Sequence, residues 1–133
     1  MTRRIVPAVS PFAATVGYSR ALRDGRHVYV AGTAAIYPDG VETPSDAYSQ
    51  ARRCLEIIVG ALAEVGATAA DVVRTRVYLV RAEDWEDVGR AHGEVFGDVR
   101  PATAFLVIAG LLDPRWLVEI EAEAVLPALK AAE

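Results

Sequence analysis

The stretch from Leu117 to Val125 reads LVEIEAEAV, and its apolar and acidic residues alternate strictly. Successive side chains of a β-strand point to opposite faces of a sheet, so this pattern predicts a strand with one apolar and one acidic face. The acidic face carries Glu119, Glu121 and Glu123. Carboxylates about 7 Å apart repel one another unless water or cations neutralise them. The second face of the sheet is therefore either solvated or matched by positive charge.

Residues 72–80 form a predicted strand that offers such a match. One face of this strand is expected to carry Val73, Thr75, Val77 and Leu79, and the other Arg74, Arg76 and Tyr78. If this strand lies beside residues 117–125, arginines stand opposite glutamates and the polar face neutralises itself. We expect the two strands to be neighbours in one sheet.

Turn signals near the N-terminus predict a β-hairpin. Residues 18–22 and 27–32 are apolar-rich runs separated by Asp24-Gly25, a pair that readily adopts the positive φ of a tight turn. Gly32 lies late in the second run, where a glycine either permits a ligand or partner to approach the backbone or simply relieves packing. The sequence leaves both interpretations open.

The first predicted helix starts at Thr43 and ends at Gly66. Thr43 is the expected N-cap, Pro44 fits the first helical position, and Asp46 completes a capping box. Its apolar stripe consists of Ala51, Cys54, Leu55, Ile58, Leu62 and Val65. We expect the thiol of Cys54 to be a small buried group and not a reactive one.

The second predicted helix spans residues 83–96, with Gly97 as its C-cap. Its apolar stripe is expected to contain Trp85, Val88, Ala91 or His92, Val95 and Phe96. A further strand follows at residues 103–108, and a turn leads to the last strand. The order ββαβαββ predicts an α+β fold, with one mixed sheet and both helices on its apolar face.

Composition limits the classes of function. The 133 residues suit a single domain spanning residues 1–133, and the net charge of −4 offers no basic field for nucleic acid. One cysteine excludes an intrachain disulfide and a CxxC metal pair. The N-terminus lacks the apolar segment of a signal peptide, and no apolar run approaches the roughly 20 residues of a membrane span. We expect a soluble cytoplasmic protein that binds neither nucleic acid nor membrane.

Several short motifs are distributed along nearly the whole chain. They are GYSRA at 17–21, VAGT at 30–33, FGD at 96–98, RPA at 100–102 and VEIEAEAV at 118–125. Together they resemble the Rid (YjgF, RidA-like) family of reactive-intermediate imine and enamine deaminases. The resemblance implies a chorismate-mutase-like fold that forms a homotrimer around a central barrel, with three small-molecule pockets at the subunit interfaces. It implies no cofactor and no metal.

The resemblance also assigns expected roles to single residues. Glu119 is the expected catalytic residue, because the matching glutamate of the family helps to position the hydrolytic water. Tyr18 and Gly32 match residues that line the family's substrate pocket. Thr103 and His92 occupy two further pocket positions and are expected to bind substrate.

Three pocket positions depart from the family pattern. Thr103 stands where the family has a carboxylate-binding arginine, Gly89 replaces an asparagine, and His92 replaces a tyrosine. Arg100 is no simple substitute, because an odd number of positions separates it from Thr103 and it points to the other face of an extended chain. We therefore expect a substrate other than a standard 2-imino acid.

Two functions of different classes remain open from the sequence. The retained Glu119 favours a hydrolase that acts on a small imine, enamine or related reactive intermediate. The absent arginine favours a non-catalytic trimer that binds a small metabolite in the same cleft. Glu119 as a purely structural charge and His92 as a packing residue are the corresponding simpler interpretations. The net charge of −4 argues against the family's older endoribonuclease label.

Overall fold

The computed structural model describes residues 3–128. The elements are, in chain order, β1 (Arg3–Pro7), α1 (Ala13–Val16), β2 (Ser19–Asp24), β3 (His27–Thr33), α2 (Ala47–Glu64), the 3-10 turn η1 (Ala69–Asp71), β4 (Val72–Leu79), the 3-10 turn η2 (Ala82–Asp84), α3 (Trp85–Phe96), β5 (Ala102–Val107) and β6 (Val118–Val125).

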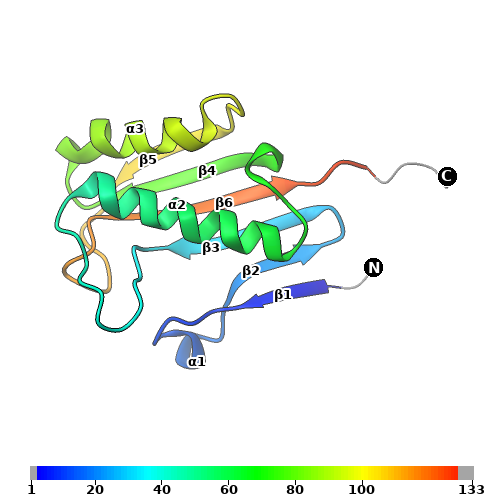
Figure 1. The fold of residues 1–133 in the computed structure, drawn as a ribbon, viewed down its shortest axis with the longest axis horizontal. Coiled ribbons are helices and arrows are strands. Elements are labelled where there is room, and N and C mark those ends of the chain that lie inside the picture. The colour runs from blue at the N-terminus through cyan, green and yellow to red at the C-terminus, as the bar shows by residue number, and fades with distance from the viewer. Residues whose placement is uncertain (1–2, 129–133) are drawn as a thin grey trace.

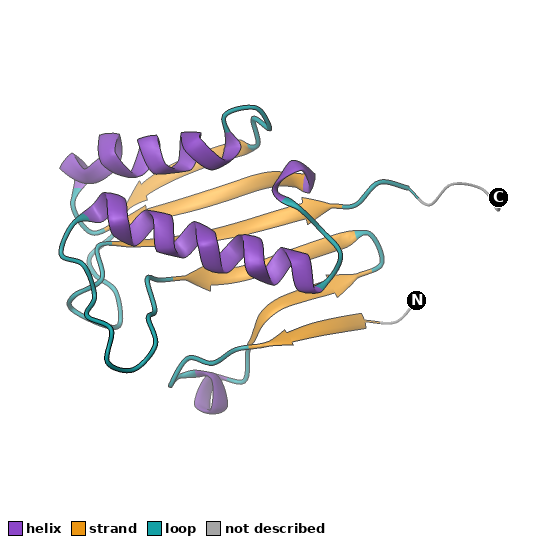
Figure 2. Ribbon diagram, viewed as in Figure 1, coloured by secondary structure: helices purple, strands orange, loops and turns teal. Residues whose placement is uncertain are grey.

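The strands form one mixed sheet in the order β1-β2-β3-β6-β4-β5. Strands β4 and β5 pair in parallel, whereas the other neighbours are antiparallel. Figure 1 shows α2 and α3 together on one face of this sheet, and Figure 2 shows the two layers by colour. The predicted α+β architecture is confirmed, and β1 and α1 are additions that the sequence pattern did not indicate.

The core lies between the helices and the apolar face of the sheet. The predicted stripe of α2 is at most 1% exposed at Ala51, Cys54, Leu55, Ile58, Leu62 and Val65. The apolar residues of β6 face it and are equally buried: Val118, Ile120, Ala122 and Ala124. Each large buried side chain of this kind contributes about 1.5–3 kcal/mol through removal from water. Gly66, at φ +83°, ends the helix as predicted.

The expected pairing of arginines with glutamates is present. Strands β4 and β6 are neighbours, and their register puts Arg74 opposite Glu123 and Arg76 opposite Glu121. Nη1 of Arg76 lies 3.3 Å from Oε1 of Glu121 and 3.5 Å from Oε1 of Glu123. The hydroxyl of Tyr78 donates to Glu121. Because these side chains are all about a third exposed or more, the pairs add little stability in one isolated chain and serve mainly to neutralise the face.

The start of α2 differs from the prediction. Asp46, and not Thr43, is the N-cap, and its carboxylate accepts a 2.8 Å hydrogen bond from the backbone N–H of Ser49. The carbonyl of Pro44 accepts from the Gln50 side chain at 2.8 Å. These two bonds keep residues 43–45 in the loop, so the helix begins at Ala47.

Two predicted core residues are exposed. Val73 is 46% exposed, because an irregularity in the β4–β6 register between Val72 and Arg74 buries Val72 in its place. Trp85 is 58% exposed at the first position of α3, whereas Val88, Ala91 and Phe96 of the predicted stripe are buried.

Candidate functional site

Three of the five site residues expected from the sequence line one cavity. Tyr18 precedes β2, Gly32 lies near the end of β3, and Glu119 is the second residue of β6. The cavity has a volume of about 220 Å³. Its remaining lining residues are Ser10, Phe12, Val16, Arg20, Ala31, Ala34, Ile36, Leu112 and Trp116. Pockets for drug-sized ligands have volumes of about 300–1,000 Å³, so this smaller cavity suits a smaller molecule.

A bulge in the sheet brings Gly32 beneath the carboxylate of Glu119. The β3–β6 register shifts between Val30 and Thr33, so Ala31 and Gly32 share a single register step. A β-carbon placed on Gly32 would lie 2.9 Å from Oε2 of Glu119. The glycine therefore makes the space that the Glu119 carboxylate of the same chain occupies, so the geometry supports the packing interpretation of Gly32.

Aromatic and aliphatic side chains form an apolar part of the cavity lining. Phe12 and Trp116 meet edge to face, with ring centroids 6.4 Å apart. Buried Gln50 fixes the loop that carries Trp116, because its side chain donates to the carbonyl of Arg115 at 3.0 Å and accepts from the N–H of Leu117 at 2.8 Å. The apolar wall is thereby attached to the first turn of α2.

Glu119 has the electrostatic properties of a proton-transfer group. Burial raises the pKa of its carboxyl above the ordinary value, and the neighbouring charge of Glu121 adds to this increase. The guanidinium of Arg20 opposes both effects by favouring the ionised form. A carboxylate with a raised pKa is a stronger base than one in water, which suits it to accept a proton from a bound water.

Arg20 is a lining residue that the sequence reasoning missed. The residue is only 8% exposed, and its Nη2 donates to the carbonyl of Gly32 at 2.6 Å. Burial lowers the pKa of Arg20, while Tyr18 and Glu119 oppose that effect. The GYSRA motif contained the signal, because it puts a cation two residues after the expected pocket residue Tyr18.

The other two expected site residues lie elsewhere in the chain. Oγ1 of buried Thr75 is 2.8 Å from Nε2 of His92 and 2.8 Å from Oγ1 of Thr103. The hydroxyl of Thr103 also lies 3.2 Å from the carbonyl of Pro101 and donates toward it. Burial lowers the pKa of His92, so its ring is neutral near pH 7. The structure thus connects His92 and Thr103 through Thr75, at the β5 edge of the sheet.

Thr103 and Glu119 face opposite sides of the sheet. In the strand register, Thr75 is level with Thr103, and these residues point toward the helices. Tyr78 is level with Glu119, and these point away from the helices. Within one subunit, residue 103 therefore does not share a cavity with Glu119.

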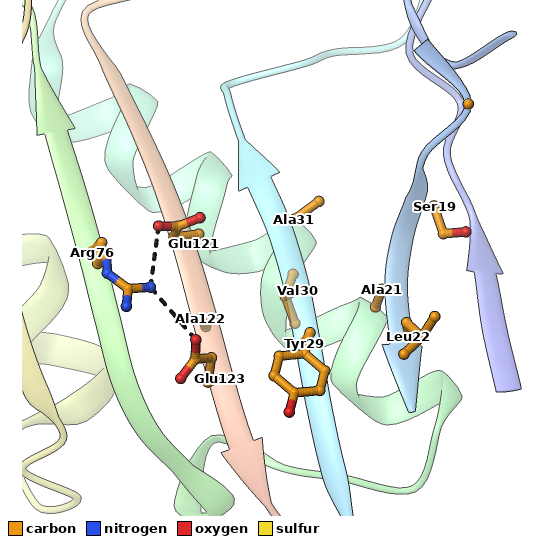
Figure 3. A pocket seen from close by; sticks show the side chains of 11 residues that line it. Ser19, Ala21, Leu22, Tyr29, Val30, Ala31, Arg76, Glu121, Ala122 and Glu123 are labelled. Atoms are coloured by element: carbon orange, nitrogen blue, oxygen red, sulfur yellow. Dashed lines mark hydrogen bonds and ion pairs between the residues drawn. The ribbon is translucent and has the colours of Figure 1, made fainter. Parts of the chain in front are cut away.

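The sheet face away from the helices contains a second hollow, of about 390 Å³. Figure 3 shows Arg76 of β4 reaching toward Glu121 and Glu123 of β6, with Tyr29 of β3 beside them. These charges are already paired with one another, whereas the carboxylate of Glu119 has no such ion pair within residues 3–128. The Glu119 cavity is therefore the better candidate for chemistry.

Other reactive groups offer no alternative centre. Burial raises the pKa of the Cys54 thiol strongly, which agrees with its predicted role as a buried apolar group. Within residues 3–128, no three His, Cys, Asp or Glu side chains gather as metal ligands. No helix in that range has the length and hydropathy to cross a membrane.

Comparisons with known proteins agree with the geometry. Residues 8–126 match the family model described as Endoribonuclease L-PSP. An uncharacterised protein of Streptomyces coelicolor is 42% identical over 121 residues, covering 91% of this chain and 90% of the relative. A Mycobacterium tuberculosis crystal structure of the YjgF/YER057c/UK114 family has a TM-score of 0.86 at 42% identity, covering 94% of this chain and 100% of that one.

A Yersinia pestis protein of the conserved Rid family has a TM-score of 0.80 at 26% identity, covering 94% of this chain and 100% of that one. The matches span almost the whole chain and include the strands and loops that line the Glu119 cavity. This chain therefore belongs to the YjgF/Rid family, whose sequence model carries the description Endoribonuclease L-PSP.

Proposed function

We propose that this protein is a hydrolytic deaminase that converts a small imine or enamine into a carbonyl compound and ammonia. The observation that carries the proposal is the position and pKa of the Glu119 carboxyl group. It lies over Gly32 in a small cavity, and burial raises its pKa. Family membership supports the same reaction class. The proposal places the reaction in the cytoplasm and requires neither a metal nor a cofactor.

The chemistry needs one positioned base that later acts as an acid. Glu119 accepts a proton from water while the water oxygen bonds to the imine carbon, and it returns this proton to the imine nitrogen. In the resulting carbinolamine, Glu119 moves the hydroxyl proton to the nitrogen, so ammonia leaves as the C–N bond breaks and the carbonyl product remains. The balance is one imine and one water for one carbonyl and one ammonia. An enamine enters the same sequence after protonation at carbon converts it to the imine.

The apolar wall supports this reaction by excluding bulk water. Phe12 and Trp116 pack against each other and line the cavity together with Glu119, so Glu119 works in a medium where its charge and hydrogen bonds act strongly. Tyr18 lines the same cavity and is the proposed hydrogen-bonding group for the substrate.

Position 103 argues against a standard 2-imino acid as substrate. Thr103 is neutral, and its hydroxyl is already engaged by Thr75 and Pro101. A neutral hydroxyl bond contributes about 1 kcal/mol, against about 1.5–3 kcal/mol for each bond to a charged group.

A second candidate function is binding of a small metabolite without turnover. The neutral Thr103 favours it, because the residue that would hold a carboxylate for reaction is replaced. An RNA substrate is disfavoured by the net charge of −4.

The deciding experiment generates imines in the presence of the purified protein and follows ammonia release. Neutral imines and 2-imino acids are produced in situ by amine and amino-acid oxidases, with semicarbazide as the competing trap. Faster ammonia release for at least one neutral imine supports the deaminase. Saturable binding of the corresponding carbonyl compounds with no acceleration for any imine supports the binding protein instead.

A further inference from the structure

Arg20 is a buried cation with an incomplete set of partners. The residue is 8% exposed, and its one described side-chain hydrogen bond runs from Nη2 to the carbonyl of Gly32. Its Nε lies buried with no partner among residues 3–128. A guanidinium carries five N–H donors, and here the buried Nε donor is left unused by the described residues.

The cost of such a group is high unless an anion compensates it. A buried charge without a partner destabilises the fold by more than a neutral residue of the same shape, and burial lowers the pKa of Arg20 accordingly. No carboxylate oxygen lies within 4.0 Å of its guanidinium in the described part of the chain. Glu119 attracts it only from a greater distance.

By contrast, some arginines outside the cavity have close anionic partners, whereas Arg23 and Arg26 donate to backbone carbonyls. Arg76 lies 3.3 Å from Glu121, and Arg81 lies 2.9 Å from Asp84. These cations are far more exposed than Arg20, with side chains 37% and 49% accessible. The least solvated of these three guanidiniums is therefore the one that lacks an ion pair.

The position of Arg20 gives the missing anion a place to bind. Arg20 lines the Glu119 cavity together with Tyr18 and Gly32, and Phe12 and Trp116 contribute apolar surface to the same lining. A molecule that fits this arrangement has a negatively charged end toward Arg20 and a small apolar body toward the aromatic wall. The planar fork of a guanidinium is suited to a carboxylate, which accepts two parallel N–H bonds.

We propose that Arg20 binds the carboxylate of a small apolar-bodied ligand in the Glu119 cavity, and so supplies from within the subunit the positive charge that Thr103 lacks. The inference rests on the proposed function only in taking this cavity as the ligand site. A carboxylate held by Arg20 lies beside Gly32 and not at position 103.

Benzoate and benzamide provide a matched pair of probes, because they share a shape and differ in charge. Calorimetric titration at pH 7 is expected to give benzoate an affinity at least about tenfold higher than that of benzamide. Equal affinities for the two probes, or tighter binding of benzamide, would overturn the proposal from the unsubstituted protein alone.

Substitution of Arg20 separates binding from folding. Arg20→Met keeps a long side chain but removes the charge, so benzoate should lose about tenfold or more in affinity while benzamide binds as before. Arg20→Lys keeps the positive charge but not the planar guanidinium fork. Its benzoate affinity is expected to lie between those of the unsubstituted protein and Arg20→Met. Benzoate binding to Arg20→Met at the original affinity would contradict the proposal.

Arg23→Gln is the matched control. Arg23 lies on the same strand and also donates to backbone carbonyls, those of Gly25 and Val65, but it is not among the cavity residues. It should leave benzoate affinity unchanged; loss of benzoate binding in this variant as well would assign the effect to β2 as a whole. These titrations measure binding and need no turnover. Their result is therefore independent of whether the deaminase assay succeeds or fails.

Discussion

Oε2 of Glu119 occupies the position that a side chain on Gly32 would need, with only 2.9 Å between the oxygen and a β-carbon placed there. The absence of a side chain at residue 32 therefore determines where the carboxylate lies. This relationship connects a strand bulge in β3 to the proposed chemistry at β6.

Gly32→Ala is predicted to impair the site without impairing the fold. Gly32 does not have a positive φ, so alanine fits the backbone, and the clash falls on the flexible end of Glu119. Urea denaturation should show a change in unfolding free energy within about 1 kcal/mol. The turnover rate or ligand affinity should fall about tenfold or more because a displacement near 1 Å disrupts catalytic alignment.

Gly60→Ala provides the control for that substitution. No heavy atom lies within 4 Å of a β-carbon placed on Gly60 in α2, so alanine should stabilise the helix by about 0.5–1 kcal/mol. Its activity should match that of the unsubstituted protein. Full activity in Gly32→Ala would mean that the position of the Glu119 carboxylate does not matter.

Glu119→Gln is predicted to stabilise the protein at neutral pH. Burial raises the pKa of Glu119, so the folded state holds the proton more tightly than the unfolded state does. The resulting stability is fully present below the unfolded pKa, near 4.5, and is lost as pH rises through the raised folded pKa. Glutamine avoids this loss. The variant should resist urea better than the unsubstituted protein at pH 7, with the difference shrinking toward pH 4.

Glu123→Gln is the matched control for the pH series. It lies on the same face of β6 and loses its ion pairs with Arg74 and Arg76, so it should gain no stability at pH 7. A destabilised Glu119→Gln at pH 7 would show that the Arg20 attraction outweighs the burial of the carboxylate.

The β4–β6 pairing and the core face of α2 were predictable from the sequence, because the charge pattern and the apolar pattern indicate the same arrangement. The alternation of β6 and the arginines of β4 predicted both the strand pairing and its neutral polar face, which the register confirms. The stripe of α2 predicted the core because a helix repeats every 3.6 residues whatever its tertiary surroundings. The helix start was wrong because Thr43 and Asp46 are both acceptable caps, and loop contacts of Gln50 decide between them.

The site was less predictable because it depends on irregularities. Residues 3–7 have no alternating pattern, so β1 was missed, although it pairs with β2 through a register shift before Pro7. The bulge in β3 puts Ala31 and Gly32 at one register step, which strict alternation cannot indicate. Arg20 was missed for a related reason, because a charged residue in a strand reads as solvated until its burial is known.

Thr75→Val is predicted to lower the unfolding free energy by about 1–3 kcal/mol, because it removes a buried hydroxyl that serves two partners. The lost contacts are those to His92 Nε2 and Thr103 Oγ1. Thermal or urea unfolding checks this value. Thr103→Val, at the exposed edge, should cost no more than about 0.5 kcal/mol. Equal effects of both substitutions would contradict a central role for Thr75 in this cluster.

The subunits are predicted to form a homotrimer through the sheet face that lies away from the helices. On that face the edge strand β5 exposes Leu106, which is level with Tyr78 and 41% accessible, and an exposed apolar residue at a sheet edge suits a covered surface. Light scattering at micromolar concentration should give about three times the 14.3 kDa chain mass. Leu106→Asp should dissociate the assembly, whereas Val41→Asp, in an exposed loop, should not. A monomeric unsubstituted protein would exclude an interfacial cleft.

The most direct test of catalysis by Glu119 compares Glu119→Gln with Glu123→Gln in turnover of the best imine found in the ammonia-release screen. Both substitutions remove one charge from the same face of β6, and only Glu119 lines the cavity. If Glu119 is the general base, Glu119→Gln should lower kcat/KM by about 100-fold or more, while Glu123→Gln should stay within about threefold of the unsubstituted protein. Equal kcat/KM for Glu119→Gln and the unsubstituted protein would contradict this role.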